Sequence, residues 1–120
     1  MRRKDSTVQC HFHPHLTSFL FSVDELYKEK WETELTITSG SESDARHSKT
    51  SLHYAIPCQA ADLRTWSVGL VPSPSVQFSR IKEVAIRWAE EEGIPEDWID
   101  VILESDHIHV EFQPKRLAGV

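Results

Sequence analysis

The sequence predicts an α+β fold in which a small, mostly antiparallel sheet is flanked by helices. Residues 16–31 and 74–92 carry apolar side chains at helical spacing, and three shorter segments alternate apolar and polar residues as strands do. The chain has 120 residues, of which 39% are hydrophobic, and this suffices for one domain with a modest core. We therefore expect an N-terminal arm at residues 1–15 and a single domain at residues 16–120.

The first predicted helix follows a polar leader. Residues 1–15 are rich in polar side chains, which predicts an arm or an edge strand. The apolar spacing of residues 16–31 then predicts a helix. Ser22 and Glu25 would also suit a capping box, so this segment could instead form two shorter helices.

Two strands are predicted in the middle of the chain. Residues 34–38 alternate and are β-rich, and Ser39-Gly40 ends that strand. Residues 40–52 form a polar loop rich in Ser, Thr and charged side chains, a kind of segment that often carries function. A second short strand is expected at residues 58–64, directly after Pro57.

The second predicted helix is delimited by residues that favour helix ends. Pro74 suits its first turn, and Gly93 suits its C-terminal stop after Glu92. Four apolar residues at helical spacing form its expected buried stripe: Phe78, Ile81, Ala85 and Trp88. Residues 98–103 and 107–112 alternate on either side of a short polar turn, which predicts a C-terminal hairpin.

The last strand carries two imidazoles on one side. Because side chains alternate along a strand, His107, His109 and Glu111 share one face. With Asp106 in the turn beside them, they make a candidate metal or acid–base site. The alternative interpretation of this pattern is an exposed polar strand face.

A second pair of candidate ligands lies upstream. His53 ends the polar loop, and Asp62 lies in the strand expected at residues 58–64. A histidine and a carboxylate that are joined by another histidine give the open, three-ligand zinc site that catalysis uses. Taken singly, each residue is more simply a surface or ion-pairing residue.

Four blocks in order give the sequence a family resemblance. Residues 37–40 (ITSG), 51–54 (SLHY), 60–64 (AADLR) and 106–111 (DHIHVE) resemble successive motifs of the zinc D-alanyl-D-alanine carboxypeptidase and L-alanyl-D-glutamate endolysin family. That family has the hedgehog/DD-peptidase fold. The resemblance extends over residues 16–113 and therefore covers most of the chain.

The resemblance implies a role for each matching residue. His53, Asp62 and His109 match the three zinc ligands of the family. Asp106 matches the general base, and His107 matches the histidine that stabilises the developing oxyanion. The implied cofactor is therefore Zn²⁺.

Three features of the match leave alternatives. Arg46 lies where family members keep a substrate-binding arginine, and Lys49 competes for that role. Glu104 competes for the role of general base. Eight residues separate His53 from Asp62, whereas family members have six, so the chain differs from the pattern between these two ligands.

The implied function is that of a zinc-dependent metallopeptidase that cleaves peptidoglycan stem peptides, of the D-Ala-D-Ala carboxypeptidase or L-Ala-D-Glu endopeptidase type. A phage lysin would fit this description. One alternative is a non-catalytic phage structural, assembly or binding protein that keeps the fold with structural zinc. Another is a metal-free α+β interaction domain.

Composition restricts the partners and the compartment. The formal net charge of −6 argues against nucleic-acid binding, which needs a basic face. No apolar run resembles a signal peptide or a membrane span, so we expect cytoplasmic synthesis, with the product released to the cell wall or carried on a virion. The only two cysteines, Cys10 and Cys58, form no CxxC pair. We expect a monomer whose partner is a peptidoglycan peptide.

Overall fold

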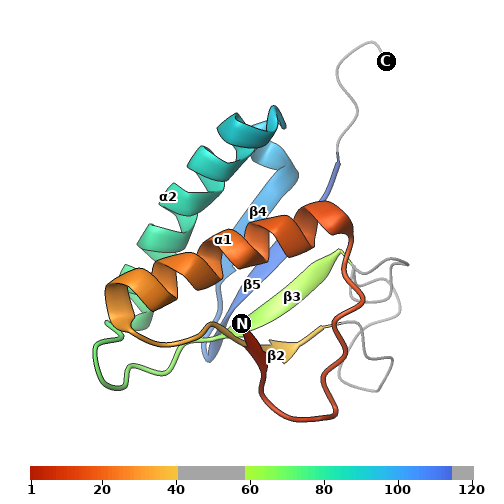
Figure 1. The fold of residues 1–120 in the computed structure, drawn as a ribbon. Coiled ribbons are helices and arrows are strands. Elements are labelled where there is room, and N and C mark those ends of the chain that lie inside the picture. The colour runs from red at the N-terminus through yellow and green to blue at the C-terminus, as the bar shows by residue number, and fades with distance from the viewer. Residues whose placement is uncertain (41–58, 115–120) are drawn as a thin grey trace.

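The computed structural model describes residues 1–40 and 59–114 (Figure 1). The elements in chain order are β1 (Arg2–Arg3), α1 (Pro14–Trp31), β2 (Thr36–Ser39), β3 (Ala60–Arg64), α2 (Pro74–Glu92), the 3₁₀ turn η2 (Glu96–Trp98), β4 (Ile99–Leu103) and β5 (His107–Phe112). This arrangement confirms the predicted α+β class. Within the described residues, neither helix is both long and apolar enough to cross a membrane.

The five strands form one mixed sheet in the order β1-β2-β3-β5-β4. Only the short β1 runs parallel to its neighbour, and the other three pairs are antiparallel, so the sheet is mostly antiparallel as predicted. β3 and β5 are adjacent although Asp62 and His109, which lie opposite each other, are 47 positions apart in the sequence. The strand that carries the two candidate histidines, β5, is therefore an interior strand of the sheet.

Both helices pack on one face of the sheet, and α1 crosses β3 and β5 on that side (Figure 1). The core lies between these two layers and includes fully buried side chains from both helices, from β2, β3 and β5, and from the residue before β2: Leu16, Phe19, Leu20, Leu35, Ile37, Leu63, Ile81, Ile108 and Phe112. The other face, here named the polar face, carries the side chains that alternate with the core residues of β3 and β5: Asp62, Arg64, His107, His109 and Glu111.

The first helix is continuous and begins earlier than its apolar spacing predicts. Pro14 occupies the first turn, where its missing N–H costs no hydrogen bond. The Nδ1 atom of His13 accepts a hydrogen bond from the backbone N–H of His15 at 3.1 Å and caps the helix. The alternative of two shorter helices is therefore wrong, since α1 runs unbroken to Trp31.

Residues 1–15 contribute to the folded domain. They supply the edge strand β1, and Val8 and Phe12 are buried in the core. These apolar side chains stand alone among polar neighbours, so hydropathy patterning does not reveal their burial. The second helix has its predicted ends, since it runs from Pro74 to Glu92 and Gly93 adopts the left-handed conformation with φ of 68°. Ile81, Ala85 and Trp88 of its predicted stripe are buried, whereas Phe78 is only partly buried.

Candidate metal centre

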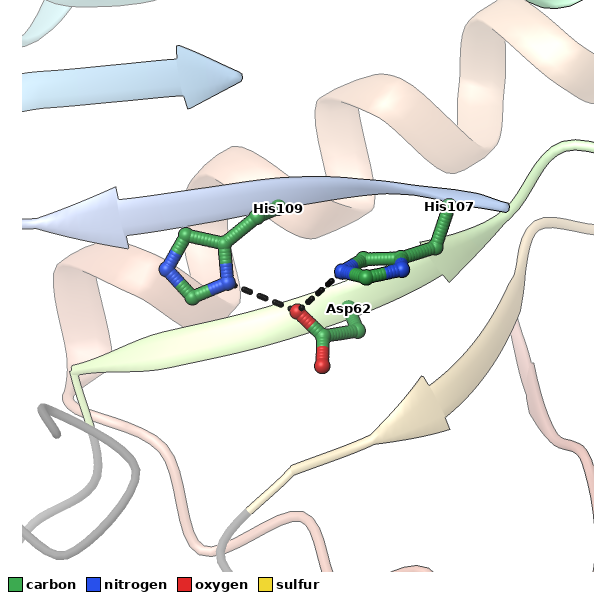
Figure 2. Close-up of side chains that lie close together, drawn as sticks. All are labelled: Asp62, His107 and His109. Atoms are coloured by element: carbon green, nitrogen blue, oxygen red, sulfur yellow. Dashed lines mark hydrogen bonds and ion pairs between the residues drawn. The ribbon is translucent and has the colours of Figure 1, made fainter. Parts of the chain in front are cut away.

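Three potential metal ligands converge on the polar face. Asp62 comes from β3, and His107 and His109 come from β5 (Figure 2). The strand register explains this convergence, because Asp62 is directly opposite His109 and His107 lies two residues along the same face. One donor atom from each of the three side chains lies within 4.8 Å of the other two.

One carboxylate oxygen lies between the two imidazoles. Asp62 Oδ1 is 2.7 Å from Nδ1 of His109 and 3.5 Å from Nε2 of His107. Ligand atoms around a tetrahedral zinc ion, at about 2.0–2.1 Å from the metal, lie about 3.3 Å from one another. The separation of Asp62 Oδ1 from His107 Nε2 is within about 0.2 Å of this value, and its separation from His109 Nδ1 needs to open by about 0.6 Å. Two imidazoles and one carboxylate are also a donor set that zinc uses, so the three residues fit a zinc ion.

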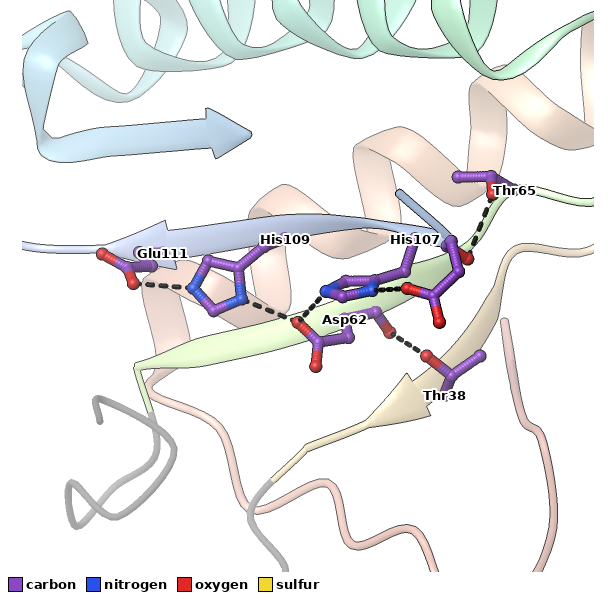
Figure 3. Close-up of polar contacts among 7 residues, drawn as sticks. Thr38, Asp62, Thr65, His107, His109 and Glu111 are labelled. Atoms are coloured by element: carbon purple, nitrogen blue, oxygen red, sulfur yellow. Dashed lines mark hydrogen bonds and ion pairs between the residues drawn. The ribbon is translucent and has the colours of Figure 1, made fainter. Parts of the chain in front are cut away.

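The outer nitrogen of each imidazole contacts another carboxylate. Nδ1 of His107 lies 2.5 Å from Oδ1 of Asp106, and Nε2 of His109 lies 2.6 Å from Oε1 of Glu111 (Figure 3). In metal sites, a ligating histidine commonly donates its other N–H to a carboxylate, and this contact fixes the tautomer and the ring orientation. Both imidazoles therefore have the hydrogen-bonded outer nitrogen of a metal-ligating histidine.

Two threonines hold the backbone on which this cluster is built. The hydroxyl of Thr38 in β2 donates to the backbone carbonyl of Asp62, and that of Thr65 donates to the carbonyl of Asp106, both at 3.3 Å (Figure 3). The first contact ties β3 to β2, and the second ties the end of β3 to the β4–β5 turn. The cluster thus rests on three strands and one turn.

The electrostatic environment suits a cation. Burial disfavours the charged form of His109, but the hydrogen bonds to Asp62 and Glu111 outweigh this effect and raise the pKa of His109 above its ordinary value. These two carboxylates therefore favour a positive charge at the imidazole. A metal ion that binds there supplies that charge and displaces the proton.

The structure brings together four of the six site residues that the sequence predicts: Asp62, Asp106, His107 and His109. The other two, His53 and Arg46, lie outside the described residues, as does the competing Lys49. Glu104 is described and exposed, and it holds the turn through its backbone N–H, which donates to the carbonyl of His107 at 2.9 Å.

No protein-family model matches the sequence, and no curated protein matches it. The three described donors leave a fourth tetrahedral position to another ligand. That ligand is water or substrate in catalytic zinc sites and a protein side chain in structural ones. The same cluster therefore suits a catalytic or a structural metal.

Proposed function

We propose that this chain is a zinc-dependent peptidase of the hedgehog/DD-peptidase fold that hydrolyses peptidoglycan stem peptides. The observation that carries the proposal is the placement of Asp62 between His107 and His109, with a further carboxylate on the outer nitrogen of each imidazole. The order of the four sequence blocks supports the peptidase assignment within this wider class of zinc sites.

Asp62 and His109 are zinc ligands in every version of the proposal. The family resemblance gives His53 as the third ligand, whereas His107 is the third donor among the described residues. These two sets predict different zinc-binding defects. His53→Ala impairs zinc binding more than His107→Ala in the first set, and the order is reversed in the second.

The chain's own residues provide proton transfer in this proposal. A bound zinc ion supplies a Lewis acid that polarises the scissile carbonyl and makes an attacking water more acidic. Asp106 accepts a proton from that water and delivers it to the leaving amine. His107 hydrogen-bonds to Asp106, so its imidazole sets the orientation of the carboxylate that moves the proton.

The direct test combines metal analysis with a cleavage assay. We expect purified chain to bind one zinc per molecule, and to release fragments from peptidoglycan of at least one stem type. His109→Ala should lose both zinc and cleavage. One zinc per chain without cleavage of any of several stem types would contradict the peptidase proposal and favour a structural or binding protein.

Asp106→Asn separates proton transfer from structural support. The asparagine carbonyl still accepts a hydrogen bond from His107 but cannot accept a proton, so zinc should remain bound while cleavage falls by about 10²–10⁴-fold. Glu104→Gln is the matched control, because it removes a neighbouring charge in the same turn and should leave cleavage near the wild-type rate. The reverse result would transfer the role of general base to Glu104.

A further inference from the structure

A hollow beside the metal cluster has cationic side chains in part of its wall. It has a volume of about 290 Å³. Asp62 and His107 of the metal cluster line it together with the neighbouring carboxylate of Asp106. The cationic side chains of Lys4 and Arg64 also line it. Trp66 lines the hollow next to Arg64, and Thr38 and Ser39 of β2 also line it. The metal cluster and the two cations therefore face the same small space.

Arg64 is held in a geometry that suits anion binding. It is the last residue of β3 and lies opposite His107, so its side chain shares the polar face with the cluster. Its guanidinium carbon lies 3.8 Å from the centre of the Trp66 ring, which is itself 62% exposed. A guanidinium that stacks on an aromatic ring keeps its N–H groups at the edge, where they can bind a carboxylate with two parallel hydrogen bonds.

Lys4 adds a second cation from the residue that directly follows β1. Its backbone N–H donates to the carbonyl of Ile37 at 2.9 Å, which fixes its main chain next to β2. Its side chain is exposed and lines the hollow. Within residues 1–40 and 59–114, neither Lys4 nor Arg64 forms an ion pair with a carboxylate of the chain.

The negative net charge of the chain makes local positive charge important for binding an anionic substrate. The chain has a formal net charge of −6, and Asp62, Asp106 and Glu111 add negative charge around the two histidines. An anionic substrate is therefore repelled by most of the molecule and needs local positive charge to approach the cluster. Among the described residues that line the hollow, Lys4 and Arg64 supply that charge.

We infer that Arg64, stacked on Trp66 and assisted by Lys4, binds a free carboxylate of the substrate within about one residue of the bond to be cleaved. The inference rests on the proposed function for the position of that bond. The distance limit follows from the size of the hollow, because the cluster and the cations share about 290 Å³. The carboxylate fixes the direction in which the peptide crosses the metal cluster.

Both candidate stem-peptide bonds have such a carboxylate. In D-Ala-D-Ala, the terminal carboxylate belongs to the residue that leaves. In L-Ala-D-Glu, glutamate uses one carboxyl group to continue the chain and keeps the other free. The shared ligand is thus a carboxylate on the amino acid that supplies the leaving nitrogen, and peptides of each type distinguish the two sources.

The test is calorimetric titration of the 120-residue chain, both with zinc and with a chelator, using two peptide pairs. One pair is N-acetyl-D-Ala-D-Ala and its C-terminal amide, and the other is N-acetyl-L-Ala-D-Glu and its form with both carboxyl groups amidated. At least one carboxylate peptide should bind about tenfold or more tightly than its amide. Arg64→Gln should remove this preference, and the exposed Lys4→Gln should reduce it without affecting the fold.

Arg80→Gln is the control, because Arg80 is exposed on α2 and pairs with Glu83 there. It should retain the full preference. The inference is overturned if no carboxylate peptide binds more tightly than its amide, or if Arg64→Gln and Lys4→Gln both retain the wild-type preference. If the chain binds the carboxylate peptide more tightly than its amide but binds no zinc, only the proposed function is contradicted. If the chain binds zinc but does not prefer the carboxylate peptide, only this inference is contradicted.

Discussion

Glu111 determines which nitrogen of His109 is available to a metal ion. Its carboxylate lies 2.6 Å from Nε2, and since an ionised carboxylate only accepts hydrogen bonds, Nε2 carries the proton. Asp62 accepts a hydrogen bond from Nδ1 at 2.7 Å in the same way, so both nitrogens carry a proton when no metal is bound. A metal ion that binds Nδ1 displaces the proton there, while Glu111 keeps the proton on Nε2. Glu111 is therefore a positioning residue for the metal centre.

Replacement of Glu111 by alanine should weaken zinc binding by about 10–100-fold, the usual cost of losing such a supporting carboxylate. The imidazole of His109 would lose both its fixed orientation and its preferred tautomer. Glu111→Gln should lie between wild type and Glu111→Ala, because its carbonyl still accepts the Nε2 hydrogen bond without the negative charge. Competition with a zinc-binding dye at fixed pH measures all three affinities.

Asp100 provides the matched control for this prediction. It lies opposite Glu111 on β4 and carries the same charge, so Asp100→Ala changes the local charge by the same amount. None of its described contacts is with His109, and zinc affinity should fall less than threefold. Equal losses in Glu111→Ala and Asp100→Ala would show that Glu111 acts only through its net charge.

The sequence predicts the residue types of this site better than their contacts. Alternation along residues 107–112 is a local property, so the common face of His107, His109 and Glu111 follows from it directly. The pairing of Asp62 with His109 instead depends on strand register across 47 residues, which no local pattern specifies. The sequence places Glu111 on this face, but its contact with Nε2 of His109 depends on side-chain rotamers, which alternation does not specify.

At the scale of the elements, Asp24 joins α1 to β2. It is 3% exposed, accepts a hydrogen bond from the backbone N–H of Leu35 at 2.9 Å and pairs with Lys28 at 3.0 Å. The α-amino group of Met1 also contacts it at 2.9 Å. Burial alone would raise the pKa of Asp24, but these hydrogen bonds and charges outweigh burial and lower it.

Asp24→Asn should therefore destabilise the fold in a pH-dependent way. Near pH 7, the loss should be about 1–3 kcal/mol, because the neutral amide gives up the charged contacts of a buried group. A carboxyl whose pKa is lowered by folding contributes stability above its ordinary pKa and loses it as the pH falls through the lowered value. The difference between wild type and Asp24→Asn should therefore narrow below about pH 4.

Urea unfolding at a series of pH values measures this difference. Glu83→Gln is a suitable control, since Glu83 pairs with Arg80 on the exposed side of α2 and should change stability by less than about 1 kcal/mol at any pH. A difference between wild type and Asp24→Asn that stays constant from pH 7 to pH 3 would mean that the charge of Asp24 does not stabilise the fold.

Element boundaries follow from the sequence wherever a local chemical signal marks them. Gly93 ends α2 because a left-handed residue without a side chain suits that position, and the C-terminal hairpin follows from alternation around a polar turn. The burial of Gln77 has no such signal. Its amide accepts from the Tyr27 hydroxyl at 2.6 Å and donates to the carbonyls of Thr65 and Pro72, contacts that tertiary packing alone creates.

At the scale of the whole molecule, the metal cluster and the hydrophobic core lie on opposite faces of the same strands. On β5, Ile108 and Val110 enter the core, while the alternate residues His107 and His109 form the cluster. A metal ion bound by β3 and β5 would therefore reinforce the middle of the sheet without replacing any core contact. The fold should not depend on the metal for its existence.

Removal of zinc should accordingly lower the thermal stability of the chain without unfolding it. With free zinc at about 100 times its dissociation constant, binding stabilises the fold by about 2.7 kcal/mol, which corresponds to a fall of roughly 10 °C in Tm on chelation. Far-UV circular dichroism at 25 °C should stay unchanged. In His109→Ala, chelator should produce no shift, and this variant separates zinc in the cluster from metal bound elsewhere. If the chain unfolds at 25 °C when zinc is removed, the prediction is wrong, and the fold depends on metal binding because the hydrophobic core alone does not keep it stable.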